Sequence, residues 1–161
     1  MKFFAITILV FCLISAAKAA VPSKALMAAE LRKESTTERC PNGGDDFAEG
    51  DKYDTEGNLK DPSEWAYGCY QIHLSCMRDY NKRHGTKFVP EDCLGNRALS
   101  EKVFLDYMRH YATKKHLHHT PTDEDMARIW NGGPSGWRLS CTLVYWNGAP
   151  GRPGVRDYLK D

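Results

Sequence analysis

The amino-acid sequence predicts a mainly α-helical single domain. Its 161 residues suit one compact unit with a real core. Several segments place apolar residues at helical spacing between residues that cap helices. An aromatic content of 11% excludes a solvated, disordered chain. The net charge of +1 gives no support to nucleic-acid binding, which usually needs a basic face.

The first nineteen residues have the pattern of a secretory signal peptide. Lys2 precedes an apolar run over residues 5–14, and small residues then lead to an Ala-x-Ala site at Ala17 and Ala19. A membrane-spanning helix needs about 20 apolar residues, so the run is too short for a retained anchor. We therefore predict cleavage after Ala19 and a secreted, extracellular protein without membrane attachment.

Cleavage changes the composition of the chain. It removes two lysines and one cysteine, which leaves 20 basic residues against 21 acidic ones. Disulfides are expected in an oxidising compartment, and an odd number of cysteines leaves at least one unpaired. We predict a domain over residues 20–147, followed by a loosely held Gly/Pro-rich tail over residues 148–161. Cys76 and Cys93 are the first choice for a disulfide; the remaining mature cysteines, which stay unassigned, are Cys40, Cys69 and Cys141.

The first helix and the loop after it have clear local signals. Ser23 can cap a helix that runs through residues 24–31 and ends near Glu34 and Ser35. Residues 36–64 contain few apolar side chains and several Gly, Asn and Pro turn signals. This composition predicts a long loop with a possible small hairpin, and long loops in compact domains are often functional.

Two further helices follow the loop. Residues 74–84 form a predicted helix that Gly85 ends, and residues 89–92 form a turn. Ser100 is the predicted start of the clearest helix. In this helix Val103, Tyr107 and Tyr111 recur at i, i+4 and i+8 and so lie on one apolar face.

The last third of the chain contains a strong helix start and stop. Thr122 and Asp125 resemble a capping box at the start of a short helix over residues 126–130. The segment 131–134, Asn-Gly-Gly-Pro, ends that helix. Residues 137–146 are apolar and are also predicted to be helical.

Three short segments carry a resemblance to a known family. They are Lys33-Glu34-Ser35, the sequence YGCYQI at residues 67–72 and ARIWNGGP at residues 127–134. In this order they resemble the lysozyme-like superfamily, particularly soluble lytic transglycosylases and goose-type lysozymes. The third segment also resembles that of invertebrate-type lysozymes. The resemblance covers residues 26–137 and implies a lysozyme-like domain in which the long loop belongs to the active site.

The resemblance implies a pair of carboxylates. Cleavage of a glycosidic bond needs a carboxylic acid that is still protonated near neutral pH, and by resemblance Glu34 is that acid. The alternative is that Glu34 is a solvated helix residue. Asp51 is the candidate second carboxylate, because Gly50-Asp51 looks like the Gly-Asp that follows the acid in related sequences. An inverting hydrolase would use Asp51 to hold water, whereas a lytic transglycosylase needs no such residue.

Other residues are candidates for substrate binding. The amides of Gln71 and Asn131 could hydrogen-bond to N-acetyl groups or sugar hydroxyls. The aromatic rings could stack on sugar rings or instead pack in the core, and these residues are Tyr67, Tyr70 and Trp130.

The sequence contains only weak indications of a metal-binding site. The acidic stretch from Asp45 to Glu56 is either a solvated loop or a weak calcium site. The cluster of His116, His118 and His119 is more typical of a solvated helix end. We therefore predict no metal and no cofactor.

These observations predict a secreted muramidase that cleaves β-1,4 linkages of bacterial peptidoglycan, in an antibacterial or digestive role and as a monomer. The main alternative is a non-catalytic saccharide-binding or extracellular-matrix protein on the same scaffold. A third is isopeptidase activity, which would require a Cys or Ser nucleophile with a His. The sequence identifies no such pair.

Overall fold

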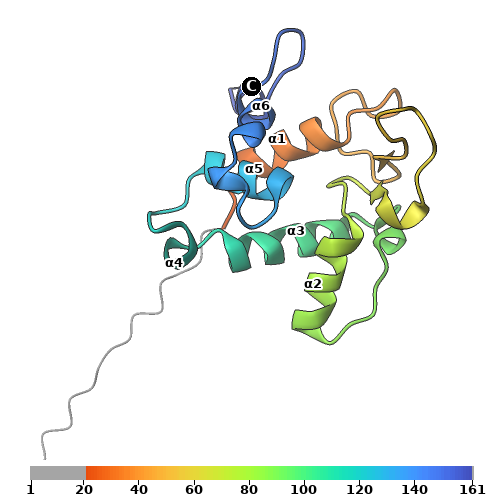
Figure 1. Ribbon diagram of the computed structural model, residues 1–161, viewed down its shortest axis with the longest axis horizontal. Coiled ribbons are helices and arrows are strands. Elements are labelled where there is room, and N and C mark those ends of the chain that lie inside the picture. The colour runs from red at the N-terminus through yellow and green to blue at the C-terminus, as the bar shows by residue number, and fades with distance from the viewer. Residues whose placement is uncertain (1–20, 161) are drawn as a thin grey trace, which may run out of the picture.

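The computed structural model describes residues 21–160 (Figure 1). The predicted signal peptide, residues 1–19, lies outside the described residues. None of the helices within residues 21–160 is long and apolar enough to cross a membrane. The predicted fold class is confirmed, because the described chain forms one mainly helical domain with a two-stranded hairpin.

The helices are short, and a single hairpin interrupts their order along the chain. Strand β1 (Glu49–Gly50) pairs antiparallel with β2 (Ala66–Tyr67). Short 3-10 turns occur at Pro62–Glu64, Pro90–Cys93, Gly136–Arg138 and Ser140–Thr142. The α-helices are α1 (Lys24–Glu34), α2 (Leu74–His84), α3 (Arg97–Tyr111), α4 (Lys114–Leu117), α5 (Asp123–Gly132), α6 (Leu143–Asn147) and α7 (Val155–Tyr158).

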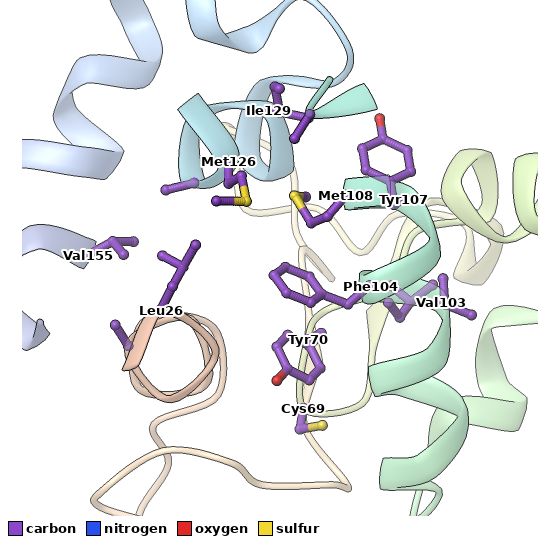
Figure 2. Close-up of a cluster of buried hydrophobic side chains, with 14 of the residues drawn as sticks. Leu26, Cys69, Tyr70, Val103, Phe104, Tyr107, Met108, Met126, Ile129 and Val155 are labelled. Carbon is purple, nitrogen blue, oxygen red and sulfur yellow. The ribbon is translucent and has the colours of Figure 1, made fainter. Parts of the chain in front are cut away.

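The core lies between α1, α3 and α5. Figure 1 shows α3 running across the molecule, with α1 and α5 on one side of it. Figure 2 shows Leu26 of α1, Phe104 of α3 and Met126 of α5 around one apolar cluster, and all three are buried. Burial of this apolar surface is the main favourable term in folding, so α3 is the central element of the domain.

Helix α3 begins earlier than predicted. Asn96, not Ser100, is its N-cap, and the Asn96 side chain accepts a hydrogen bond from the backbone N–H of Leu99 at 3.1 Å. Ser100 lies inside the helix, where its hydroxyl donates to the carbonyl of Asn96 at 3.2 Å. Both Asn and Ser are common N-caps, so residue type alone could not distinguish the two positions.

The segment over residues 137–146 is only partly helical, which corrects the prediction of one continuous helix. Two 3-10 turns precede α6 because this part of the chain wraps closely around Arg128 of α5. A Cβ atom on Gly136 would lie 2.0 Å from the Arg128 carbonyl oxygen. The Arg128 Nε donates to the Thr142 hydroxyl at 3.0 Å, and a straight helix would not allow both contacts.

The tail after residue 147 is packed, which corrects the prediction of a loosely held segment. Val155 is fully buried in the main core, and Figure 2 shows it beside Leu26 of α1. The guanidinium of Arg32 lies 4.6 Å from the centre of the Tyr158 ring. Val155 and Tyr158 therefore dock α7 on α1, despite the Gly and Pro residues before it.

The cysteine prediction also needs correction. All five cysteines within residues 21–160 are free thiols, and Cys76 and Cys93 are not paired. Cys76 lines a cleft on the α2 side of the molecule. Cys93 instead lies against Gly68, because a Cβ atom on that glycine would be 3.0 Å from the Cys93 Cβ atom. Cys93 belongs to the main apolar cluster and Cys76 packs against it, but no disulfide joins them.

Replacing Val155 with Ala tests the packing of the tail. The change removes two buried methyl groups and leaves a cavity beside α1, so we expect the free energy of unfolding to fall by about 2 kcal/mol. Val144 is 57% exposed and serves as the control, since Val144→Ala should change stability by less than about 0.5 kcal/mol. Urea denaturation at constant pH measures both. Equal effects of the two variants would contradict a docked tail.

Candidate functional site

A cleft of about 310 Å³ brings together five of the residues predicted for the site. It lies where the end of α1, the hairpin, the start of α2 and the end of α5 meet. Both predicted carboxylates line it, together with His73, Tyr107 and small neighbouring residues. The five predicted residues around the cleft are Glu34, Asp51, Gln71, Trp130 and Asn131.

Ser35 fixes the end of α1 relative to the rest of the cleft. Its buried hydroxyl lies 2.8 Å from the carbonyl oxygen of Cys69 and 3.0 Å from that of Leu31. The same hydroxyl oxygen accepts a hydrogen bond from the backbone N–H of Gly44 at 3.0 Å. Helix α1, the long loop and the segment that leads to Gln71 therefore meet at one side chain next to Glu34.

Glu34 has the electrostatic environment of a proton donor. Burial is the main cause that raises its pKa from 4.5 to about 7, and the nearby charge of Asp51 adds to the rise. A hydrogen bond from Tyr145 and the charge of Lys33 act in the opposite direction. With a pKa of about 7, a large fraction of Glu34 keeps its proton at neutral pH, as general acid catalysis requires.

Asp51 lies in the cleft with a different environment. It follows strand β1 in the left-handed backbone region, with φ of 53°, which a residue with a side chain seldom adopts. Its Oδ2 lies 3.1 Å from Nε2 of His73, and both side chains are well exposed. Strained backbone of this kind is concentrated at functional sites, so the conformation supports a role for Asp51.

Gln71 is the second residue of the cleft with a left-handed backbone, with φ of 52°. Its side-chain Nε2 donates to the carbonyl of Gly68 at 2.9 Å. A Cβ atom on Gly50 would lie 1.9 Å from Oε1 of Gln71, so the glycine before Asp51 makes room for this amide. The hairpin thus positions Asp51 and Gln71 together.

Trp130 and Asn131 reach the cleft from the last turn of α5. The Trp130 ring packs edge-on against Phe104 and Tyr107, with ring centroids 4.8 Å and 5.6 Å away. These contacts hold the half-buried indole at the cleft wall. Asn131 follows it and is exposed, so its amide is available to a bound molecule.

Tyr67 and Tyr70 do not line the cleft, which corrects their predicted role in sugar stacking. The Tyr67 hydroxyl donates to the carbonyl of Pro62 at 3.0 Å, and its side chain is buried behind the hairpin. Tyr70 is fully buried and stacks on Phe104, with ring centroids 4.5 Å apart (Figure 2). The left-handed turn at Gln71 reverses the local direction of the chain, so Gln71 reaches the cleft and Tyr70 the core.

Sequence reasoning missed three residues of the site. His73 immediately follows the Gln-Ile motif, and this adjacency could have identified it. Tyr107 lies on the predicted apolar face of its helix, so the sequence indicated a core residue. It does belong to the core, but it also lines the cleft. Tyr145, whose hydroxyl reaches Glu34, has no local signal because 111 positions separate the two residues.

The acidic residues of the long loop have local partners. Asp45 accepts from the backbone N–H of Phe47 at 2.9 Å, and Asp54 accepts from that of Asn58 at 2.9 Å. In the part of the chain that the structure describes, no three His, Cys, Asp or Glu side chains gather as they would around a metal ion. The histidine cluster is also divided, since His119 lies 2.9 Å from Asp125 whereas His116 contacts the carbonyl of Pro134.

The raised pKa of Glu34 predicts a pH dependence of stability. Between the ordinary pKa of 4.5 and the folded value of about 7, the folded state binds more protons than the unfolded state. Stability should therefore fall as the pH rises through this range. We expect Glu34→Gln to weaken this fall, and the exposed Glu56→Gln to leave it intact. Thermal unfolding from about pH 4 to 8 measures it; identical pH slopes for Glu34→Gln and the unmodified chain would exclude a raised pKa at Glu34.

Comparisons with known proteins support the fold. No family model matches the chain, and no curated protein matches it. Among solved structures, the crystal structure of the lysozyme from Tapes japonica is similar, with a TM-score of 0.57 and 24% sequence identity. The match covers 82% of this chain and 94% of the other. The mainly helical domain that carries the cleft therefore has a lysozyme-like fold.

Proposed function

We propose that this protein is a secreted glycosidase that cleaves the β-1,4 linkages of bacterial peptidoglycan. The observation that carries the proposal is Glu34, a carboxyl group with a pKa of about 7 at a cleft that also contains Asp51. Two carboxyl groups in unlike environments are the usual equipment for glycosidic cleavage. The likeness in fold to a protein named as a lysozyme agrees with this chemistry.

In the proposed reaction, Glu34 donates its proton to the oxygen of the scissile linkage. The bond between that oxygen and the anomeric carbon breaks, and the sugar ring develops positive charge. Trp130 offers an apolar wall for a sugar ring, and the amides of Gln71 and Asn131 offer hydrogen bonds to its substituents. These groups fit a polar polymer with N-acetyl groups better than a small apolar ligand.

The role of Asp51 distinguishes two forms of the reaction, hydrolysis and transglycosylation. As a base, it would hold a water molecule that attacks the anomeric carbon, with His73 orienting its carboxylate. Without such a base, a hydroxyl group of the substrate itself would attack, as in a lytic transglycosylase. We favour hydrolysis because Asp51 is held in the cleft in a conformation that costs backbone energy.

The alternatives from the sequence have less support. A non-catalytic saccharide-binding protein would not need a carboxyl group with a raised pKa at the cleft. For an isopeptidase, the cleft does contain Cys76 and Ser75 close in sequence to His73. Burial, however, raises the pKa of the Cys76 thiol to about 12, and a thiol needs to ionise to act as a nucleophile. Cys76 is therefore a poor nucleophile.

Clearing of a suspension of bacterial cell walls tests the activity. We expect the mature protein to clear the walls and Glu34→Gln to lower the rate at least about 100-fold, because the general acid is lost. Glu56→Gln, an exposed change outside the cleft, is the matched control. Binding to walls is measured in parallel by sedimentation. A wild-type protein that binds walls without clearing them would support the saccharide-binding alternative instead.

The role of Asp51 has its own test. We expect Asp51→Asn to lower the rate by about 100-fold and wild-type products to carry one added water per broken linkage. Mass spectrometry of the released fragments measures the second quantity. Products that are one water lighter, together with an active Asp51→Asn variant, would instead establish transglycosylase chemistry.

A further inference from the structure

A second carboxyl group is joined to Glu34 through Tyr145. Glu30 lies one turn before Glu34 on the same face of α1 and is fully buried. The Tyr145 hydroxyl, which comes from α6, forms hydrogen bonds with Oε2 of Glu30 and with Oε1 of Glu34. Three oxygen atoms from two elements therefore form one short chain next to the cleft.

The number of protons in this chain restricts its ionisation. A phenol has one proton and donates one hydrogen bond, so the second bond needs a proton from one of the two carboxyl groups. Oε1 of Glu30 is buried and has no hydrogen-bond partner. An ionised Glu30 would thus leave part of its charge unsatisfied, which is expensive in the interior, whereas a neutral acid leaves only a carbonyl oxygen.

The charged groups around Glu30 agree with a neutral acid. Burial first, and then the neighbouring Glu34, raise the pKa of Glu30 well above its ordinary value. Tyr145 and Lys33 act in the opposite direction. The Lys33 ammonium, however, donates to the carbonyl of Pro153 at 2.9 Å, so its hydrogen bond goes to the backbone and not to Glu30.

We propose that Glu30 is a positioning residue for the glycosidase reaction: it remains neutral, donates its proton to the Tyr145 oxygen and so directs the Tyr145 proton to Glu34. This inference rests on the proposed function of Glu34. It assigns to Glu30 no contact with the substrate, because Glu30 acts through Tyr145 alone.

The chain of hydrogen bonds matters after the proton of Glu34 has left. That proton moves to the leaving oxygen, which takes the electron pair of the broken bond, and Glu34 becomes a half-buried carboxylate. Tyr145 then donates to this carboxylate, and the bond from Glu30 makes Tyr145 a stronger donor because linked hydrogen bonds polarise one another. Glu30 and Tyr145 thereby offset part of the burial cost of the new charge, and no proton needs to pass along the chain.

Two replacements of Glu30 separate hydrogen bonding from shape. Gln keeps a donor for the Tyr145 oxygen, whereas Leu has a similar size and no donor. We expect Glu30→Leu to lower kcat about 10-fold and to move the basic limb of the pH–rate profile upward, because the Glu34 carboxylate is less stabilised. Glu30→Gln should recover most of the lost kcat and return the limb to its wild-type position.

Tyr145→Phe shows whether Glu30 acts through Tyr145. In the Tyr145→Phe background there is no hydroxyl to receive the proton of Glu30, so adding Glu30→Leu should change kcat by less than about twofold. Fully additive losses would overturn the proposal. So would a Glu30→Gln variant as impaired as Glu30→Leu, since the recovery by an amide depends on its hydrogen-bond donor.

An NMR titration tests the neutral state without using activity. Carboxyl carbon signals of ¹³C-labelled glutamate are followed from about pH 4 to 9, and Glu30→Gln and Glu34→Gln assign the two signals. We expect the Glu30 signal to keep the position of a protonated acid while Glu34 titrates near a pH of about 7. This measurement shows whether Glu30 is neutral even if the Glu30→Leu variant does not fold.

The outcomes distinguish the two proposals. A Glu30 signal at the position of a carboxylate at about pH 6, in a protein that clears cell walls, would overturn the role of Glu30 alone. A folded wild-type protein that never clears walls would overturn the proposed function, and with it the catalytic purpose of this chain of hydrogen bonds. A protonated Glu30 in that inactive protein would still support the proposed direction of the hydrogen bonds, since only a neutral Glu30 has a proton to donate to the Tyr145 oxygen.

Discussion

The structure depends on how the end of helix α1 is held against the rest of the domain. This helix carries two carboxyl groups on one face, four residues apart, and its carbonyl end is also the negative end of the helix dipole. Both features disfavour ionised Glu34, so the site needs donors that come from elsewhere in the chain. Ser35 links the helix end to the Cys69 carbonyl, and Tyr145 supplies the donor for Glu34. These contacts hold the end of α1 at the cleft.

The C-terminal segment helps to hold α1 in place, although its composition does not indicate this. Helix α6 brings Tyr145 over α1, and α7 covers the same helix through Val155. The intervening turn contains several Gly and Pro residues, and such a composition is typical of loose tails. The tail is packed because Val155 is buried and Tyr158 contacts α1, and composition does not measure such contacts.

Local signals in the sequence predicted much of the fold and part of the candidate site. The Ser23 cap and the Thr122–Asp125 capping box lie where the sequence placed them, because each depends only on residues within one turn. Short motifs likewise located Glu34 and Asn131 at the cleft. The burial of Tyr70 was not predictable, because the left-handed backbone at the neighbouring Gln71 determines which of the two side chains faces the core. The link between Glu30 and Tyr145 spans 115 positions, so no local pattern encodes it.

The two carboxyl groups of the cleft obtain different properties from their supports. Glu34 is the half-buried last residue of α1, and desolvation of its carboxyl group penalises the charge and raises its pKa to about 7. Asp51 extends from a two-residue strand at the surface, where solvent and His73 surround its carboxylate. Exchanging the two side chains between helix and hairpin would therefore exchange their environments as well. The unlike environments follow from what surrounds each segment: Tyr145 of α6 covers the end of α1, whereas Asp51 follows a short strand at the surface and keeps its side chain in contact with water.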